Sequence, residues 1–375
     1  MNTDNMDLLI VGGGPVGCTI AERAASIKGW NSLIIDKRDH IGGNCYDFIN
    51  SAGQLVHKYG PHYFRTNYEE VYSYLSNFTN WIPGDYKVKS FVKDKLYPIP
   101  INLSTLEEYF NCKLNEKDAS ELLDRLSIPN KSPTNSEEFI LSRLGEDLYK
   151  DFYLGYTLKQ WEIHPRNLDP SVCGRVPIRL NRDDSYVNAT HKVMPANGFT
   201  KMFSKMIQSP RIVFEGKTNF KEIKNTYIPK IATVYTGPID EYFDYCLGKL
   251  PWRSLEFKWQ TYEKKFVQPC VQINYPNDHD FTRSVEIKHV TKQEIDSTTL
   301  SYEYPMSTGD PYYPIPQPAS SELYQRYRKL AKESYPKNKV QFTGRLAEYT
   351  YINTDEAVKR GLEAFNELVN SYGDN

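Results

Sequence analysis

Three glycines near the start of the chain have the spacing of a dinucleotide site. Gly12, Gly14 and Gly17 form a GxGxxG motif between an apolar segment and an amphipathic one, which predicts a strand, a turn and a helix. The first glycine permits a tight turn, the second lets the backbone approach a pyrophosphate, and the third lets helix and strand pack closely. Asp36 ends a second apolar segment, where its carboxylate would accept hydrogen bonds from an adenosine ribose.

A second glycine pair distinguishes between the two dinucleotides that use this motif. Lys37 follows the acidic residue, and Gly43 and Asn44 then belong to another loop with exposed backbone. A nicotinamide-binding domain would continue here to a further strand and helix. Proteins of the glutathione-reductase-like class place such a loop along an extended FAD, so the pattern favours FAD over NAD.

The stretch 58–67, KYGPHYFRTN, combines a Gly-Pro turn, a histidine, three aromatic residues and an arginine. A buried arginine needs a partner, and exposed aromatic rings would be in contact with water. We expect this stretch to lie beside a flavin, with His62 serving the cofactor and Arg65 facing the substrate. A turn with a surface arginine is the alternative.

Composition narrows the classes of partner. The 46 Lys+Arg balance 47 Asp+Glu, which gives no support for a nucleic-acid partner, and no apolar run is long enough for a membrane span. The six cysteines are scattered and the seven histidines lack metal-ligand spacing, so we expect free thiols, no bound metal and a cytoplasmic protein. The 29 tyrosines suit either a ligand with rings and phosphates or a tyrosine-rich core.

The elements that must position these residues predict an α/β fold. Helical periodicity runs over about 103–165 and begins with an S/T-x-x-E capping box from Ser104 to Glu107. Alternation over about 252–304 predicts antiparallel strands, and short apolar strands return near 211–244 and again before a C-terminal amphipathic helix.

We therefore expect an FAD-binding Rossmann-like domain, of the glutathione-reductase-like class, with two insertions. The discontinuous cofactor domain would comprise 1–83, 195–250 and 306–375, and a helical domain for substrate or dimer contacts would comprise 102–170. An antiparallel sheet domain with a mobile loop would comprise 84–101, 171–194 and 251–305.

Beyond these patterns, the chain resembles the bacterial UDP-galactopyranose mutase family over nearly its whole length. The resemblance rests on motifs in family order: HIGGN, HKYGPH, GEDLY, GYTLKQW, RVPIR, YTGPIDEYFDY, DPYYPI and GRLAEYTY. It implies an isomerase that interconverts the pyranose and furanose forms of a UDP-linked or dTDP-linked sugar for cell-surface polysaccharide. Candidate sugars are galactose, N-acetylgalactosamine and a 6-deoxyhexose. It also implies a homodimer.

The resemblance further implies that reduced flavin N5 attacks the anomeric carbon, with no net redox change and with an external reductant such as NAD(P)H. No Ser-His-Asp or Cys-His arrangement is legible, which agrees with a nucleophile supplied by the cofactor. An amine-oxidase-like FAD oxidoreductase and a non-catalytic nucleotide-sugar binding protein remain as alternatives.

By the same resemblance, Arg179 and Arg283 grip the diphosphate, with Arg179 on a mobile loop that closes over the substrate. Phe152 and Tyr156 would sandwich a uracil, and Trp161 would lie on the sugar side. The other residues expected at the substrate are Thr157, Asn274, Glu303, Tyr313 and Tyr351. The other residues expected at the cofactor are Thr236, Gly237, Arg345 and Asn353.

Three positions depart from the family pattern. Arg65 stands where the family commonly has histidine, His191 where we expect tyrosine, and Asn353 where we expect aspartate. A permanently charged arginine beside the sugar could engage an acyl oxygen or a phosphate. These departures leave the identity of the sugar open.

Overall fold

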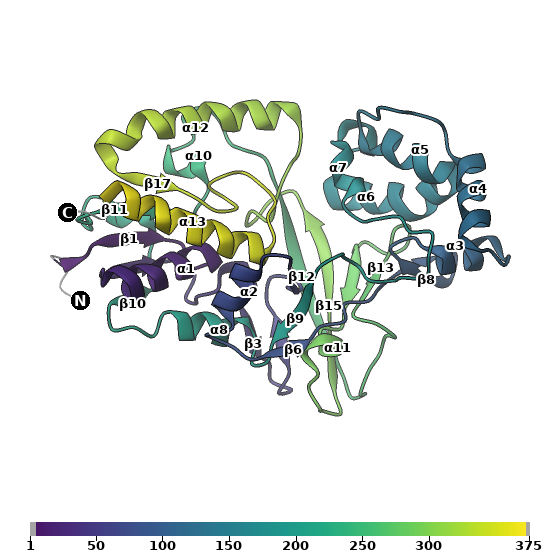
Figure 1. Cartoon of the computed structure of the whole chain (residues 1–375), viewed down its shortest axis with the longest axis horizontal. Coiled ribbons are helices and arrows are strands. Elements are labelled where there is room, and N and C mark those ends of the chain that lie inside the picture. The colour runs from purple at the N-terminus through teal and green to yellow at the C-terminus, as the bar shows by residue number, and fades with distance from the viewer. Residues whose placement is uncertain (1–4, 373–375) are drawn as a thin grey trace.

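The computed structural model describes residues 5–372 and is built around a five-stranded parallel sheet (Figure 1). Its strand order is β10-β2-β1-β11-β17, and all neighbouring strands run parallel. Helices cover parallel sheets on both faces, so the central strands are apolar throughout. The strands are β1 (Leu8–Val11), β2 (Ser32–Ile35), β10 (Ile212–Glu215), β11 (Ala232–Tyr235) and β17 (Val340–Phe342).

The sheet draws on three distant parts of the sequence, as a discontinuous Rossmann-like domain requires. Helices α1 (Pro15–Arg23) and α13 (Thr354–Tyr372) pack against each other on one face of the sheet, although they lie at opposite ends of the chain. Their apolar side chains form one core with those of β1 and β11. The predicted α/β fold class is therefore confirmed, whereas the exact domain boundaries stay a prediction.

The predicted helical segment forms one end of the molecule (Figure 1). It contains a π-helical turn at Tyr149–Leu154, and this turn joins two of its helices. The helices are α3 (Leu103–Phe110), α4 (Glu116–Leu126), α5 (Ser136–Leu148), α6 (Gly155–Trp161) and α7 (Pro170–Gly174).

The predicted capping box at the start of this segment was wrong. Helix α3 begins before Ser104, and its N-cap is Asn102. The Asn102 side chain accepts from the Thr105 amide at 3.0 Å, and the Thr105 hydroxyl accepts from the Asn102 amide at 3.3 Å. Asparagine caps as well as serine does, so the pair two residues upstream serves the helix. The Glu107 carboxylate instead accepts from the Leu114 amide at 3.0 Å.

A seven-stranded sheet lies between the helical end and the parallel sheet (Figure 1). Its order is β16-β12-β15-β14-β13-β7-β8, and neighbours run antiparallel except for β13 and β7, which pair in parallel. The strands are β7 (Val88–Val92), β8 (Lys95–Ile99), β12 (Trp252–Tyr262), β13 (Gln272–Asn274), β14 (Arg283–Val285), β15 (Thr298–Met306) and β16 (Tyr313–Pro314).

Two details of this sheet differ from the sequence prediction. The apolar run after Arg283 was expected to continue as a strand, but β14 ends at Val285 and the short helix α11 (Lys288–Thr291) follows. Strand β16 pairs with β12 although it falls in 306–375, which was assigned to the cofactor domain. This pairing brings Tyr313 next to the sheet that carries Arg283.

Smaller elements complete the fold. Strand β5 (Phe64–Thr66) pairs with β9 (His191–Pro195), which also pairs with β6 (Trp81–Pro83). Strands β3 (Asp47–Ile49) and β4 (Leu55–His57) form a separate antiparallel pair. The remaining helices are α2 (Glu69–Leu75), α8 (Phe199–Met206), α9 (Phe220–Ile223), α10 (Ile239–Tyr242) and α12 (Pro318–Asn338). Across residues 5–372, no helix is both long and apolar enough to cross a membrane.

Candidate active site

A long cavity runs from the carboxyl ends of β1 and β2 to strands β14 and β16. In open α/β sheets, this edge of the strands is where ligands bind. Fifteen of the predicted site residues line the cavity: Gly12, Gly14, Asp36, Lys37, Gly43, Asn44, His62, Arg65, Thr236, Gly237, Arg283, Tyr313, Arg345, Tyr351 and Asn353. Eight do not: Gly17, Phe152, Tyr156, Thr157, Trp161, Arg179, Asn274 and Glu303.

The glycine turn after β1 leaves no room for side chains. Gly12 has a φ of +109°, and a Cβ there would lie 2.0 Å from the Thr236 Oγ1. A Cβ at Gly17 would lie 2.0 Å from the Gly12 carbonyl oxygen, so Gly17 serves helix–strand packing and does not line the cavity. Helix α1 begins directly after Gly14, and its N-terminus favours a negatively charged group in the cavity.

The second glycine loop is built onto the first. The Gly42 amide donates to the Gly13 carbonyl at 2.7 Å. Gly43 has a φ of +55°, and a Cβ there would come within 3.0 Å of the Gly14 Cα. Side chains at these positions would push the two loops apart, so glycine keeps both backbones open toward the same cavity.

Asp36 lies at the end of β2 with its carboxylate held by the backbone. It accepts from the amide of Gly13 at 2.9 Å and from that of Arg38 at 2.9 Å. Because the carboxylate also lines the cavity, it can accept from a ribose hydroxyl there. The cradle without Cβ atoms, the helix N-terminus and this acid together fit the adenosine diphosphate part of an FAD.

Arg38, which we did not predict from the sequence, closes this end of the cavity. Its guanidinium lies 3.9 Å from the centroid of the Tyr59 ring and donates to Asn44 Oδ1 at 2.9 Å. It also donates to Asp310 at 2.9 Å, and Lys37 lies 3.1 Å from the same carboxylate. These contacts join the second glycine loop to the segment that carries Tyr312.

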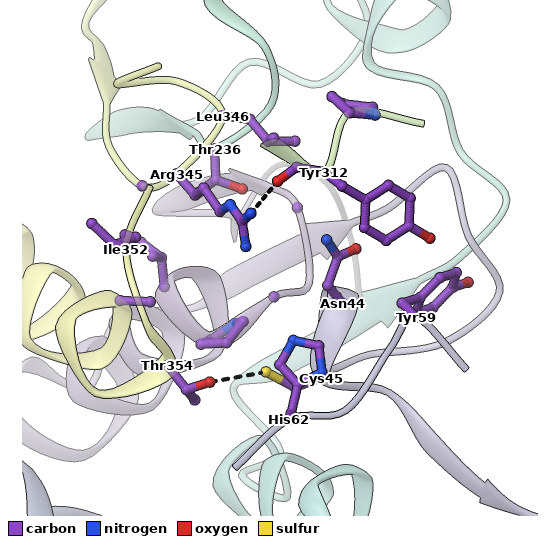
Figure 2. A pocket seen from close by; sticks show the side chains of 18 of the residues that line it. Asn44, Cys45, Tyr59, His62, Thr236, Tyr312, Arg345, Leu346, Ile352 and Thr354 are labelled. Carbon is purple, nitrogen blue, oxygen red and sulfur yellow. Dashed lines mark hydrogen bonds between the residues drawn. The ribbon is translucent and has the colours of Figure 1, made fainter. Parts of the chain in front are cut away.

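Arg345 reaches the cavity from the turn after β17. Figure 2 shows its guanidinium donating to the Tyr312 carbonyl, beside Thr236 and across the cavity from His62. Its buried Nε has no hydrogen-bond partner among the described residues. An unpaired donor in a cavity of this kind points to a polar ligand group that the arginine would bind.

His62 presents a neutral ring to the cavity. Its backbone amide donates to His57 Nδ1 at 2.9 Å, and its own Nδ1 lies 3.0 Å from the Gly60 carbonyl. Because a carbonyl only accepts, this Nδ1 carries the proton and Nε2 is left as an acceptor. Burial, reinforced by the neighbouring His57, lowers the pKa of His62 to about 3, and burial lowers the pKa of His57 to about 4.

Two of the three departures from the family pattern contact each other. Arg65 on β5 donates from Nη2 to Asn353 Oδ1 at 3.1 Å. An aspartate at 353 would form an ion pair with this arginine, whereas asparagine adds no negative charge to the contact. His191, the third departure, does not line the cavity: its ring stacks on Tyr72 at 3.7 Å and its Nε2 lies 2.8 Å from Glu69.

Arginines and tyrosines gather at the other end of the cavity. The rings of Tyr313 and Tyr351 stack with centroids 5.8 Å apart. The guanidinium groups of Arg175 and Arg345 lie 4.9 Å and 4.7 Å from the Tyr351 centroid. Burial raises the pKa of Tyr351, but the positive charges, first of all that of Arg175, outweigh it and lower this pKa overall. The same field would attract an anionic ligand.

Arg283 is held by a buried carboxylate behind it. Its Nη2 lies 2.7 Å from Glu303, which is fully buried, and 3.4 Å from the Tyr313 hydroxyl. The two charged residues face each other in the β14–β15 register. Glu303 therefore orients Arg283 from outside the cavity, and the Arg283 Nε has no partner among the described residues.

The arginine that reaches the cavity from the loop after α7 is Arg175, not Arg179. Arg179 points into its own loop, where it donates to the carbonyls of Asp183 (3.2 Å) and Ser185 and to Asn188 Oδ1 at 2.6 Å. The RVPIR motif contains both arginines, and nothing in their spacing identified which one lines the cavity. The difference depends on how the loop folds back on itself.

The residues expected on one face of the helical segment have different surroundings. Phe152 is buried against Tyr97 and Tyr109, with centroids 5.6 and 5.7 Å away, so it packs the helical core. Thr157 contacts the Cys173 sulfur at 3.7 Å. Trp161 lies edge-on to Tyr313, with centroids 6.1 Å apart, next to the cavity.

Two more of the predicted residues lie beside the cavity without lining it. Several residues that do line it were not predicted from the sequence. Asn274 accepts from Gln272 at 2.7 Å, and Gln272 lines the cavity. Tyr156 has its pKa raised by burial, with Arg283 among the charges that act on it. The lining residues that we did not predict include Arg38, Tyr59, Tyr63, Tyr86, Arg175, Tyr186, Gln272 and Tyr312. Some of them, such as Tyr59, Arg175 and Tyr312, belong to the quoted motifs, but a motif does not show which of its side chains face the cavity.

Comparison with known proteins bears on the class of enzyme. A family model described as UDP-galactopyranose mutase matches residues 151–351, and one described as an NAD(P)-binding Rossmann-like domain matches residues 10–78. The chain is 34% identical over 376 residues to a probable UDP-galactopyranose mutase of Klebsiella pneumoniae, covering 98% of this chain and 96% of that protein. It is 33% identical over 370 residues to a dTDP-fucopyranose mutase of Escherichia coli, covering 95% and 96%.

A solved structure, that of a reduced UDP-galactopyranose mutase, superposes with a TM-score of 0.76 over 98% of this chain and 94% of that one. At 16% identity this likeness supports the fold alone. The sequence relatives carry the argument further, because they match nearly the whole chain and favour a mutase over the oxidoreductase alternative. The chain belongs to the UDP-galactopyranose mutase family, a family of isomerases that interconvert pyranose and furanose sugars.

Proposed function

We propose that this protein binds FAD and interconverts the pyranose and furanose forms of UDP-galactose or a closely related nucleotide sugar. The observation that carries the proposal is the single cavity that joins a glycine cradle to a cluster of arginines and tyrosines. A cofactor held at the first end and a nucleotide sugar at the second would meet near His62 and Arg65.

The glycine end would hold the cofactor. Gly12, Gly14 and Gly43 expose backbone to the pyrophosphate, Asp36 would bind the ribose, and the unpaired Arg345 donor would bind a polar group farther along. When bound in its reduced form, FAD supplies a nucleophilic nitrogen for the anomeric carbon of the sugar. Neutral His62 adds no charge that would compete with the arginines for the substrate.

The arginine end would hold the diphosphate. When the anomeric bond breaks, the nucleotide leaves with two to three negative charges, and guanidinium groups bind such oxygens with paired hydrogen bonds. Arg175 and Arg283 line this end with the hydroxyls of Tyr313 and Tyr351. By keeping the diphosphate in place while the sugar ring opens and recloses, they would allow the nucleotide to be re-attached.

The Arg65–Asn353 pair bears on the choice of sugar. Arg65 uses one donor for Asn353 at 3.1 Å, and its side chain still lines the cavity. An acetamido oxygen or another acceptor on the sugar could take a remaining donor. We therefore include UDP-N-acetylgalactosamine, and 6-deoxyhexoses on UDP or dTDP, among the candidate substrates.

The test is an anaerobic incubation of dithionite-reduced protein with a panel of nucleotide sugars, followed by separation of the products. We expect a yellow protein that forms furanose from at least one UDP-hexose only after reduction. Stoichiometric oxygen consumption with an oxidised product would identify an oxidoreductase instead. UDP binding without bound flavin or turnover would identify a binding protein.

A further inference from the structure

We propose that Lys159 is a positioning residue that organises the loop between β13 and β14 and thereby places Arg283 in the cavity. The inference rests on the proposed function in one respect, the assignment of Arg283 to the diphosphate. Lys159 belongs to the GYTLKQW motif but does not line the cavity, so the proposed reaction gives it no direct part.

The Lys159 ammonium group lies inside a ring of backbone carbonyls. It donates to the carbonyls of Tyr275, Asp278 (2.9 Å), His279 (3.2 Å) and Phe281 (3.3 Å). All of these come from the single loop that joins β13 to β14. An ammonium has three N–H donors, so it serves this loop much as a metal cation would, through its charge and through hydrogen bonds shared among carbonyls.

The loop conformation depends on such a cation. Carbonyl dipoles that converge on one point repel one another unless a positive charge lies between them. The loop also contains strain, because His279 has a φ of +59°, which non-glycine residues rarely adopt. Without the ammonium, we expect the loop to relax into other conformations.

The loop leads directly to the residue that faces the diphosphate end. The Tyr275 amide donates to the Thr282 carbonyl at 2.8 Å and so closes the loop. The Thr282 amide donates to the Glu303 carbonyl at 2.9 Å, and Arg283 is the next residue. Relaxation of the loop would therefore be transmitted by one peptide unit to the Arg283 backbone and its ion pair with Glu303.

The same contact joins the helical segment to the sheet. A Cβ at Gly155 would lie 2.5 Å from the Pro276 carbonyl, so α6 approaches the loop as closely as glycine allows. The Asn277 side chain donates to the Asp151 carbonyl at 2.9 Å. Lys159 thus holds the loop against the helix that carries Tyr156 and ends at Trp161.

The test is a double-mutant cycle measured by UDP binding to the FAD-loaded protein. One axis is Lys159→Met, which keeps the length of the side chain but removes its charge and donors. The other is Arg283→Ala with Glu303→Gln, which removes the diphosphate contact without leaving a buried carboxylate unpaired. If Lys159 acts through Arg283, Lys159→Met weakens UDP binding about tenfold in the wild type and much less in the Arg283 background.

The matched control is Lys288→Met. Lys288 is buried, and its ammonium likewise donates to backbone carbonyls, those of Lys265 (2.9 Å), Ile295 and Ser297 (2.9 Å). Like Lys159 it does not line the cavity, but its carbonyls lie outside the loop that joins β13 to β14. Both methionine variants should lower the unfolding temperature, whereas only Lys159→Met should weaken UDP binding. If Lys159→Met is too unstable to assay, Lys159→Ala supplemented with n-propylammonium restores the missing atoms, and we expect UDP affinity to recover with amine concentration.

The outcomes separate the two proposals. If the Arg283 variant binds UDP as tightly as the wild type does, the proposed diphosphate site is wrong. If that variant loses affinity but Lys159→Met has no effect, or has the same effect in both backgrounds, the positioning role is overturned. Failure of n-propylammonium to restore affinity to a folded Lys159→Ala protein would also overturn it.

Discussion

The two ends of the cavity are built in different ways. The cofactor end consists mainly of backbone from two short loops, Gly12–Gly14 and Gly42–Gly43, which contact each other, and α1 begins directly after the first. The substrate end consists of side chains from positions far apart in the chain, including Arg175, Arg283 and Tyr351. The first is defined by the absence of side chains and the second by their convergence.

This difference affects what a mutation does. At the cofactor end, a methyl group added at Gly14 would block a ligand while leaving the unliganded fold intact. At the substrate end, removal of a side chain also removes the partner of another charged group, as with Arg283 and Glu303. We therefore expect a substitution at one end to weaken ligand binding at that end only. We expect substitutions at the substrate end to lower the free energy of unfolding more than those at the cofactor end.

Arg283→Ala is expected to have the largest effect. It removes a charge-assisted contact to the diphosphate, which should lower kcat/KM by about 10- to 150-fold. It also leaves Glu303 unpaired and fully buried. Removing one partner of a buried ion pair costs about 3–5 kcal/mol of unfolding free energy. Steady-state kinetics and urea unfolding measure the two effects, and adding Glu303→Gln should restore stability but not activity. Loss of bound FAD in either variant would contradict the separation of the two ends.

A comparison of Arg175→Ala with Arg179→Ala tests which arginine of the loop serves the substrate. Arg175 lines the cavity, so its loss should lower kcat/KM by about 10- to 150-fold with little change in unfolding temperature. Arg179 bonds its own loop, so its loss should reduce activity less and raise KM more than it lowers kcat. The opposite order would show that the loop rearranges so that Arg179 faces the diphosphate, as the sequence resemblance implies.

Gly14→Ala should affect only the cofactor end. Gly14 has an ordinary φ of −79°, and a Cβ there would lie 3.8 Å from Gly43, so the methyl group fits the unliganded fold. It would occupy space that a pyrophosphate needs, and we expect FAD affinity to fall about tenfold or more while UDP affinity is retained. Flavin fluorescence and UDP titration measure the two affinities. Unchanged FAD binding would remove Gly14 from the cradle.

Arg65→His is expected to have the smallest effect, on the ratio of two activities. If Arg65 donates to the sugar, the variant should keep activity on UDP-galactose and lose it on a second sugar that the wild type accepts. The ratio of kcat/KM values would shift by about 1–3 kcal/mol. Parallel assays on both sugars measure it, with Arg65→His/Asn353→Asp as a variant that restores both expected family residues. A constant ratio would mean that Arg65 only supports the cofactor.

The cofactor end was largely predictable from the sequence, for a physical reason. A backbone that must approach another backbone closely, or adopt the positive φ of Gly12, excludes Cβ atoms, and this requirement appears directly as glycine at fixed spacing. The apolar strands around it are equally local signals, because a buried parallel strand is apolar at every position. The α/β class and the family followed from these and from longer motifs.

The substrate end was decided by the tertiary structure. Arg65 and Asn353 are 288 positions apart, and only the pairing of β5 with β9 and the packing of α13 bring them within 3.1 Å. The choice of Arg175 over Arg179 depends on a loop that satisfies one guanidinium with its own carbonyls. The carbonyl ring around Lys159 comes from a loop more than a hundred positions away. Residue types at these positions indicated charge, but the directions of the side chains depend on contacts that no local pattern encodes.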